Sequence, residues 1–125
     1  MEQGRLSNAE FARCLRNLLD GKRLPADVPP EDAADLALAK RLNDLRRLSS
    51  RLVVGNLARQ KEIELLVSHL DRLRPVERQV LAFHLGGGYS LATVAQVTRR
   101  SETNTISCLR NGLRTLRRYV DRPPA

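Results

Sequence analysis

The side chains in this chain that could do chemistry gather between residues 99 and 118, and most carry guanidinium, hydroxyl or amide groups. A guanidinium is a planar fork of donors that matches phosphate oxygens, whereas amides and hydroxyls can hydrogen-bond base edges. We expect Thr103, Asn104 and Ser107 to meet base edges and the arginines to meet mostly phosphates. The candidate DNA contacts are Arg99, Arg100, Ser101, Thr103, Asn104, Ser107, Arg110, Arg114, Arg117 and Arg118.

Two predicted helices position these residues across a polar corner within residues 89–120. Ser90 can cap the first helix, and Ser101 can cap the second with Glu102 in its first turn. Apolar residues of the second helix recur at steps of three and four and form one stripe: Ile106, Leu109, Leu113, Leu116 and Val120. Its other face holds Thr103, Ser107, Arg110, Arg114 and Arg117. This layout is typical of a helix-turn-helix DNA reader.

Positive charge is concentrated on the same region. The formal net charge is +8, from 22 basic and 14 acidic side chains. Residues 90–125 hold seven of the basic and two of the acidic side chains, so this region carries +5 of the total. Such a distribution favours a polyanionic partner. A membrane surface is disfavoured, because the basic helix lacks the Trp or Phe anchors of an interfacial helix.

No arrangement of side chains indicates an enzyme, a metal site or a cofactor. Cys14 and Cys108 are far apart with no ligand partner nearby, and His69 and His84 are each isolated. No Ser-His-Asp, Cys-His or paired-carboxylate arrangement suggests itself. No apolar run approaches about 18 residues and the N-terminus has no signal-peptide core, so we expect a cytoplasmic protein with no membrane partner.

The chain is predicted to be all-α, because its aliphatic residues recur at helical spacing. Hydrophobic residues make up 42% of the chain and aromatic residues only 3%. Ser7 and Glu10 have the spacing of a capping box, and Leu6 with Phe11 can form a hydrophobic staple, so a first helix begins there. The proline-rich residues 22–30 then form a loop.

Residues 31–72 are predicted to form a helical arm rich in leucine. Its apolar residues follow one heptad grid, interrupted by polar positions around Gly55. The grid allows two interpretations: a break near Gly55, which we favour, or one continuous helix. The arm is also a candidate surface for pairing with a protein partner or a second copy of the chain. Its candidate partner-binding residues are Leu38, Leu42, Leu45, Ile63, Leu66 and Leu70.

A support helix is expected to precede the predicted reader. Pro75 suits the first position of a helix, and the triple glycine at residues 86–88 ends that helix in a turn. Within the reader, Gly112 costs about 1 kcal/mol relative to alanine in a helix interior. This glycine therefore indicates either a close approach of another backbone or a weakened helix.

Four motifs occur in order in the second half of the chain. LRPVERQVL spans residues 73–81, YSLATVA spans residues 89–95, RSE spans residues 100–102 and LRTLRR spans residues 113–118. Together they resemble region four of bacterial sigma factors, particularly the extracytoplasmic-function group, whose opening reads L-x-P-x-x-R-x-V-L. The resemblance implies recognition of a promoter element of the minus-35 type and contact with the flap of the RNA polymerase β subunit.

The chain departs from that family pattern in several places. Thr93 replaces the usual acidic residue, and Arg99 stands where a corner glycine is usual. In one register the family's frequent Val-Lys pair falls on Thr105-Ile106, while a second register, one residue along, lengthens the corner. Residues 1–69 show none of the recognition segments of sigma region two, so the chain cannot act alone as a complete sigma factor.

The sequence thus divides into a helical partner-binding extension at residues 1–69, a sigma region-four-like helix-turn-helix domain at residues 70–120 and a tail at residues 121–125. The predicted function is a transcription regulator that reads double-stranded DNA with the helix over residues 101–118 and contacts RNA polymerase. The alternative is a split sigma, co-sigma or anti-sigma-like module that docks on polymerase or on a sigma or anti-sigma partner without sequence-specific DNA binding. A homodimer through residues 31–72 is also open.

Overall fold

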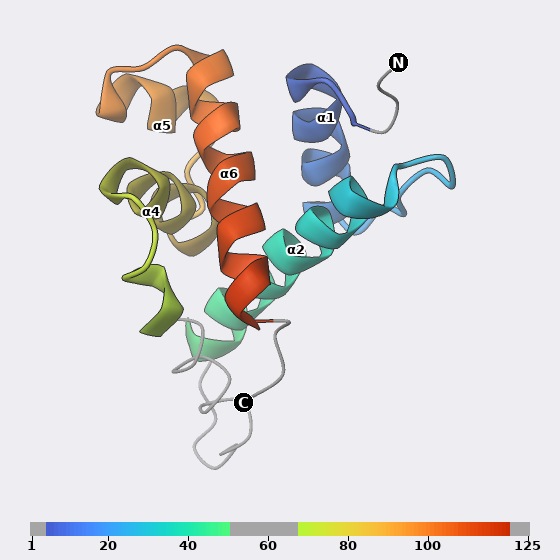
Figure 1. The fold of residues 1–125 in the computed structure, drawn as a ribbon, viewed down its shortest axis with the longest axis horizontal. Helices are drawn as coiled ribbons and strands as arrows, with labels where there is room; N and C mark the ends of the chain where they lie inside the picture. The colour runs from blue at the N-terminus through green and yellow to red at the C-terminus, as the bar shows by residue number, and fades with distance from the viewer. Residues whose placement is uncertain (1–4, 51–67, 121–125) are drawn as a thin grey trace.

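The computed structural model describes residues 5–50 and 68–120, and the regular elements in that part of the chain are helices (Figure 1). They are α1 at Asn8–Leu19, α2 at Pro30–Ser50, α4 at Pro75–Leu81, the π-helical turn η1 at Ala82–Gly86, α5 at Leu91–Thr98 and α6 at Glu102–Val120. The all-α prediction is confirmed. The predicted break near Gly55, the residues Ile63 and Leu66, and the side chain of Leu45 lie outside the described residues.

Helix α1 begins at the predicted capping box. The Ser7 hydroxyl oxygen accepts a hydrogen bond from the Glu10 backbone N–H at 3.1 Å, and the Glu10 carboxylate accepts one from the Ser7 N–H at 2.9 Å. The Ser7 backbone N–H and hydroxyl also hold the pKa of Glu10 below its ordinary value. This start directs Phe11, which is fully buried, into the core.

The predicted helix-corner-helix is also formed by local contacts. The Ser90 hydroxyl oxygen accepts from the Thr93 N–H at 3.1 Å, and the Ser101 hydroxyl oxygen accepts from the Asn104 N–H at 3.0 Å. Between the two helices Arg99 has a φ of 58°, in the left-handed region. This is the conformation that glycine adopts most readily, so Arg99 makes the turn that a corner glycine would make.

Helix α6 is the central element of the fold. Figure 1 shows it with α4 and α5 on one side and α1 and α2 on the other, and all four helices contact it. The fully buried apolar side chains come from every one of these elements: Phe11, Leu36, Val80, Val94, Leu109, Leu113 and Leu116. The core therefore crosses the predicted boundary between residues 69 and 70.

Helices α4 and α6 approach each other closely at Gly112. A Cβ atom there would lie 3.1 Å from the Leu81 Cδ1 atom and 3.3 Å from the Glu77 Cβ atom. Both distances are shorter than an ordinary van der Waals contact. A close approach therefore explains this mid-helix glycine, but the atoms that approach it belong to side chains of α4 and not to its backbone.

Replacement of Gly112 by valine should destabilise the protein by about 1–3 kcal/mol, because the added methyl groups would separate α4 from α6. Urea denaturation followed by circular dichroism measures this loss. Asn111→Val is the matched control, since Asn111 is exposed on the same helix and acquires the same β-branched side chain. Equal losses in the two variants would show that the packing at Gly112 is unimportant.

The triple glycine makes the predicted turn between the support helix and α5. A Cβ atom at Gly87 would lie 3.0 Å from the Phe83 carbonyl oxygen, and Gly88 has a φ of 78°. His84 spans this turn, with its Nδ1 atom 2.7 Å from the Tyr89 carbonyl oxygen. Burial lowers the pKa of His84, against the opposing effect of that hydrogen bond. His84 is therefore placed as a packing residue.

Candidate nucleic-acid interface

Arg110, a predicted DNA contact, is held inside the chain. Its Nη2 atom donates to the Asp32 Oδ1 atom at 2.9 Å, and its Nη1 atom donates to the Leu6 carbonyl oxygen at 2.8 Å and the Asn8 Oδ1 atom at 3.0 Å. The guanidinium also lies over the Phe11 ring, 4.7 Å from its centroid. Only 12% of the Arg110 side chain is exposed, and the Asp32 side chain is fully buried.

Arg114 and Arg117 are held in the same way by the next turn of α2. The Asp35 carboxylate, which is fully buried, accepts from the Arg114 Nη2 atom at 3.1 Å and from the Arg117 Nε atom at 2.9 Å. The Glu31 carboxylate accepts from the Arg117 Nη2 atom at 2.5 Å. Burial lowers the pKa of Arg117, but its bonds to Asp35 and Glu31 outweigh that effect and raise it.

These contacts change what the polar face of α6 can do. Three of its arginines already meet carboxylates of α2, which occupy the guanidinium forks that would otherwise bind phosphates. Ser107 is half-buried on the same side, where its hydroxyl oxygen accepts from the Asn8 side-chain amide at 3.1 Å. In this structure Arg110, Arg114 and Arg117 join α6 to α2 and do not face outward together.

The other predicted DNA contacts remain at the surface. Arg99, Arg100, Ser101, Thr103 and Asn104 are all exposed, and they lie together at the corner and in the first turn of α6. Arg118 is exposed as well, near the other end of the helix. At 1.5 Å per residue it lies about 21 Å along the axis from Asn104. The structure thus leaves a compact group at the corner and one distant arginine.

The outward face of α6 includes one exposed residue, Asn111, that the sequence interpretation missed. Asn104, Asn111 and Arg118 are exposed and spaced seven residues apart, which places them on one face two turns from each other. Thr115 is half-buried beside them. The seven-residue spacing was the available signal, but the arginines at positions 110, 114 and 117 suggested a neighbouring face.

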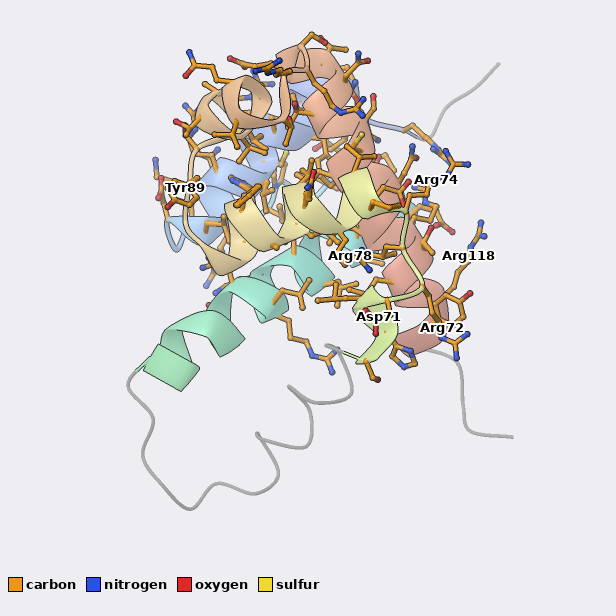
Figure 2. All side chains as sticks on the ribbon, turned by 90° about the vertical axis from the view of Figure 1, so that its left-hand side faces the viewer. Asp71, Arg72, Arg74, Arg78, Tyr89 and Arg118 are labelled. Carbon is orange, nitrogen blue, oxygen red and sulfur yellow. The ribbon has the colours of Figure 1, made fainter. Side chains whose placement is uncertain are left out.

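Two further arginines lie outside the predicted reader. Figure 2 shows Arg72 and Arg74 on the same side of the molecule as Arg118, and Tyr89 on the opposite side. The Arg72 guanidinium lies 4.8 Å from the centroid of the Tyr119 ring. Within the described residues, the exposed arginines that form no ion pair include Arg72, Arg74, Arg99, Arg100 and Arg118. Their charge is available to an external anion.

Thr105 and Ile106, the residues at which the two possible sequence registers differ, both point into the fold. Thr105 is fully buried, and its hydroxyl donates to the Ser101 carbonyl oxygen at 2.9 Å. Ile106 is 7% exposed. Neither residue faces outward, so positions 105 and 106 are part of the interior of the fold.

The predicted pairing surface of the arm is largely inside the fold where it is described. Leu38 is buried in the core, and Leu42 and Leu70 are half-buried against it. Large exposed apolar side chains lie elsewhere, at Tyr89 with 53% and Val97 with 60% of its surface exposed. Among the described residues, these two exposed apolar side chains are candidates for contact with a protein partner.

The described residues give no sign of metal chemistry. They contain no group of three His, Cys, Asp or Glu side chains that could hold a metal ion. His69 stacks on Tyr119, with 5.6 Å between the ring centroids, while Cys14 is buried and Cys108 half-buried. No helix of this part of the chain is long and apolar enough to cross a membrane.

No protein-family model, curated protein or solved structure matches the chain.

Proposed function

We propose that the protein binds double-stranded DNA through the corner between α5 and α6 and the outward face of α6. The observation that carries the proposal is the set of exposed polar residues on two capped helices, with Arg99 and Arg100 lacking any internal carboxylate partner in the described chain. A capped helix with polar residues in its first turn suits the major groove.

Each exposed side chain has a role in this proposal. Asn104 and Asn111 would hydrogen-bond base edges, since an asparagine amide can pair bidentately with adenine. Arg99, Arg100 and Arg118 would bind phosphates and fix the orientation of the helix. Arg110, Arg114 and Arg117 instead hold α6 against α2. By its resemblance to sigma region four, the chain would read a promoter element of the minus-35 type and contact RNA polymerase.

Fluorescence anisotropy with labelled duplexes across a range of salt concentrations tests the proposal. The wild-type affinity should fall as salt rises, because phosphate contacts release counterions from DNA. Binding that does not depend on salt, or no binding to any duplex, would contradict it. A pool of random duplexes with repeated selection would show whether one sequence is preferred.

Arg99→Gly separates duplex binding from folding. Glycine accepts the left-handed conformation at this position, so the free energy of unfolding should stay the same or rise by up to about 1 kcal/mol. The slope of log affinity against log salt should nevertheless become shallower by about one, since one phosphate contact is lost. An unchanged slope would show that Arg99 does not contact a DNA phosphate.

A protein-docking function is the second candidate, and a separate apolar hollow favours it. The hollow is about 240 Å³ in volume and is lined by Phe83, Tyr89, Thr93, Val94 and Val97. It lies on the Tyr89 side of the molecule, opposite Arg72 and Arg74 in Figure 2. Its exposed apolar side chains would gain from being covered by a partner.

Val97→Asp tests this second function against purified RNA polymerase in the absence of DNA. Capture by polymerase should be lost in Val97→Asp, because a charge would be placed in an apolar contact. Capture should be retained in Arg99→Gly, which alters only the proposed duplex surface. Docking through this hollow would be contradicted if both variants lost capture by polymerase. It would also be contradicted if polymerase captured neither the variants nor the wild-type protein.

A further inference from the structure

A polar hollow of about 330 Å³ lies between the start of α4 and the C-terminal half of α6. Its lining combines four arginines with one carboxylate and two neutral polar side chains: Arg72, Arg74, Glu77, Asn111, Arg114, Thr115 and Arg118. Figure 2 shows Arg72, Arg74 and Arg118 along this side of the molecule. The hollow is separate from the corner at Arg99 and Arg100.

Positive charge exceeds negative charge around this hollow. Glu77 is 7% exposed, and its carboxylate accepts the backbone N–H of Arg74 at 3.4 Å, so it is committed to the start of α4. Arg72, Arg74 and Arg118 have no ion-pair partner in the described chain. Like charges brought together around a concave surface raise one another's energy, and an anion between them would relieve it.

The fourth arginine of the lining, Arg114, is already paired with a carboxylate of α2. The Nε atom of Arg114 is buried and has no hydrogen-bond partner, although the Nη2 atom of that side chain is fixed on Asp35. Because this Nε atom has less than 1 Å² of exposed surface, a ligand in the hollow would not reach it, and the site depends on Arg72, Arg74 and Arg118.

We propose that this hollow binds a phosphate group. A phosphate offers several strong acceptor oxygens, and guanidinium forks match that geometry better than they match a single-oxygen ligand. Arg72, Arg74 and Arg118 supply the charge, and Asn111 and Thr115 supply neutral donors. The phosphate can come from a DNA backbone or from a free phosphate ion. If the phosphate belongs to a DNA backbone, the site rests on the proposed duplex function. If it is a free phosphate ion, the site is independent of that function.

Nuclear magnetic resonance with ¹⁵N-labelled full-length protein and inorganic phosphate tests the site. Saturable shifts are expected for the backbone amides of Arg74, Asn111 and Arg118. The double variant Arg74→Gln/Arg118→Gln should bind phosphate at least tenfold more weakly. Arg13→Gln/Arg16→Gln is the matched control on the exposed surface of α1 and should bind as the wild type does.

A duplex titration of the same variants distinguishes the two sources of phosphate. If the DNA backbone occupies the hollow, the salt slope should fall by about two in Arg74→Gln/Arg118→Gln. If the occupant is a free phosphate ion, the slope should fall by only about one, because Arg118 alone belongs to the proposed duplex surface, while phosphate binding is lost. If the protein binds phosphate but no duplex, the proposed DNA-binding function is refuted and the phosphate site is still supported. Wild-type affinity for both phosphate and duplex in the double variant would overturn the site itself.

Discussion

Asp35→Ala should lower the free energy of unfolding by about 3–5 kcal/mol, because it leaves buried cationic groups without their partner. The Asp35 carboxylate is fully buried and accepts from both Arg114 and Arg117. Those arginines are 19% and 23% exposed, so water can reach them in part and the loss should lie near the lower end of the range. Urea denaturation followed by circular dichroism measures it.

Asp44→Ala is the matched control for this prediction. Asp44 lies on the same helix and pairs with Lys40 at 3.0 Å, but the two side chains are 44% and 40% exposed. An exposed i,i+4 pair contributes only about 0.3–0.5 kcal/mol. Equal losses for Asp35→Ala and Asp44→Ala would mean that the contacts of Asp35 do not stabilise the fold.

The same magnitudes decide how α6 could meet DNA. Freeing Arg110, Arg114 and Arg117 for phosphates would require separating α1 and α2 from α6. That separation would also expose Phe11 and Leu36, whose burial is worth about 1.5–3 kcal/mol each. A domain is stable by only about 5–15 kcal/mol in total. The three arginines therefore serve the fold, and the proposed duplex interface is limited to the exposed residues.

Reversal of both corner charges, in Arg99→Glu/Arg100→Glu, should weaken duplex binding at least about 100-fold. Each lost charge-assisted hydrogen bond is worth about 1.5–3 kcal/mol, and every 1.4 kcal/mol is a factor of about ten in affinity. Repulsion between the new carboxylates and phosphates adds to the loss. Fluorescence anisotropy at fixed salt concentration measures the effect.

Lys22→Glu/Arg23→Glu is the matched control, since it reverses two adjacent exposed charges in the loop between α1 and α2. Figure 1 shows that loop on the side of the molecule away from α5. The two double variants change the net charge equally, so a difference between them measures the position of the charges. Similar losses in both would indicate general attraction to DNA and no defined interface.

The elements that local contacts determine could be predicted from the sequence. The caps at Ser7, Ser90 and Ser101 each use donors three residues along the chain, and the structure has all three. The apolar stripe of α6 was also predictable, because helical periodicity depends only on spacing. Such features need no knowledge of what lies across the fold.

The ion pairs of α6 could not be predicted in this way. Asp32 and Arg110 are 78 residues apart, and acidic residues such as Glu31 and Asp32 are favourable in the first turn of a helix without any distant partner. The charge excess of residues 90–125 pointed to an external polyanion, although α2 neutralises part of it. Only the packing of α2 on α6 shows whether an arginine of α6 is paired inside the chain or is available to an external polyanion.

The outward face of α6 was misplaced for a related reason. An amphipathic pattern identifies the buried stripe, but it does not show which polar neighbours a second helix will cover. Arg110 and Asn111 are adjacent and both polar, yet only Asn111 is exposed. The candidate interface therefore kept its corner residues from the sequence and gained Asn111 from the structure.

The central claim is that a duplex binds the corner and the outward face of α6 while α2 stays paired with its arginines. Amide chemical shifts of the ¹⁵N-labelled protein during addition of duplex DNA test it most directly. We expect the largest shifts at residues 99–104, Asn111 and Arg118, with Asp32 and Asp35 unchanged. Large shifts throughout α1 and α2, with none at residues 99–104, would contradict it.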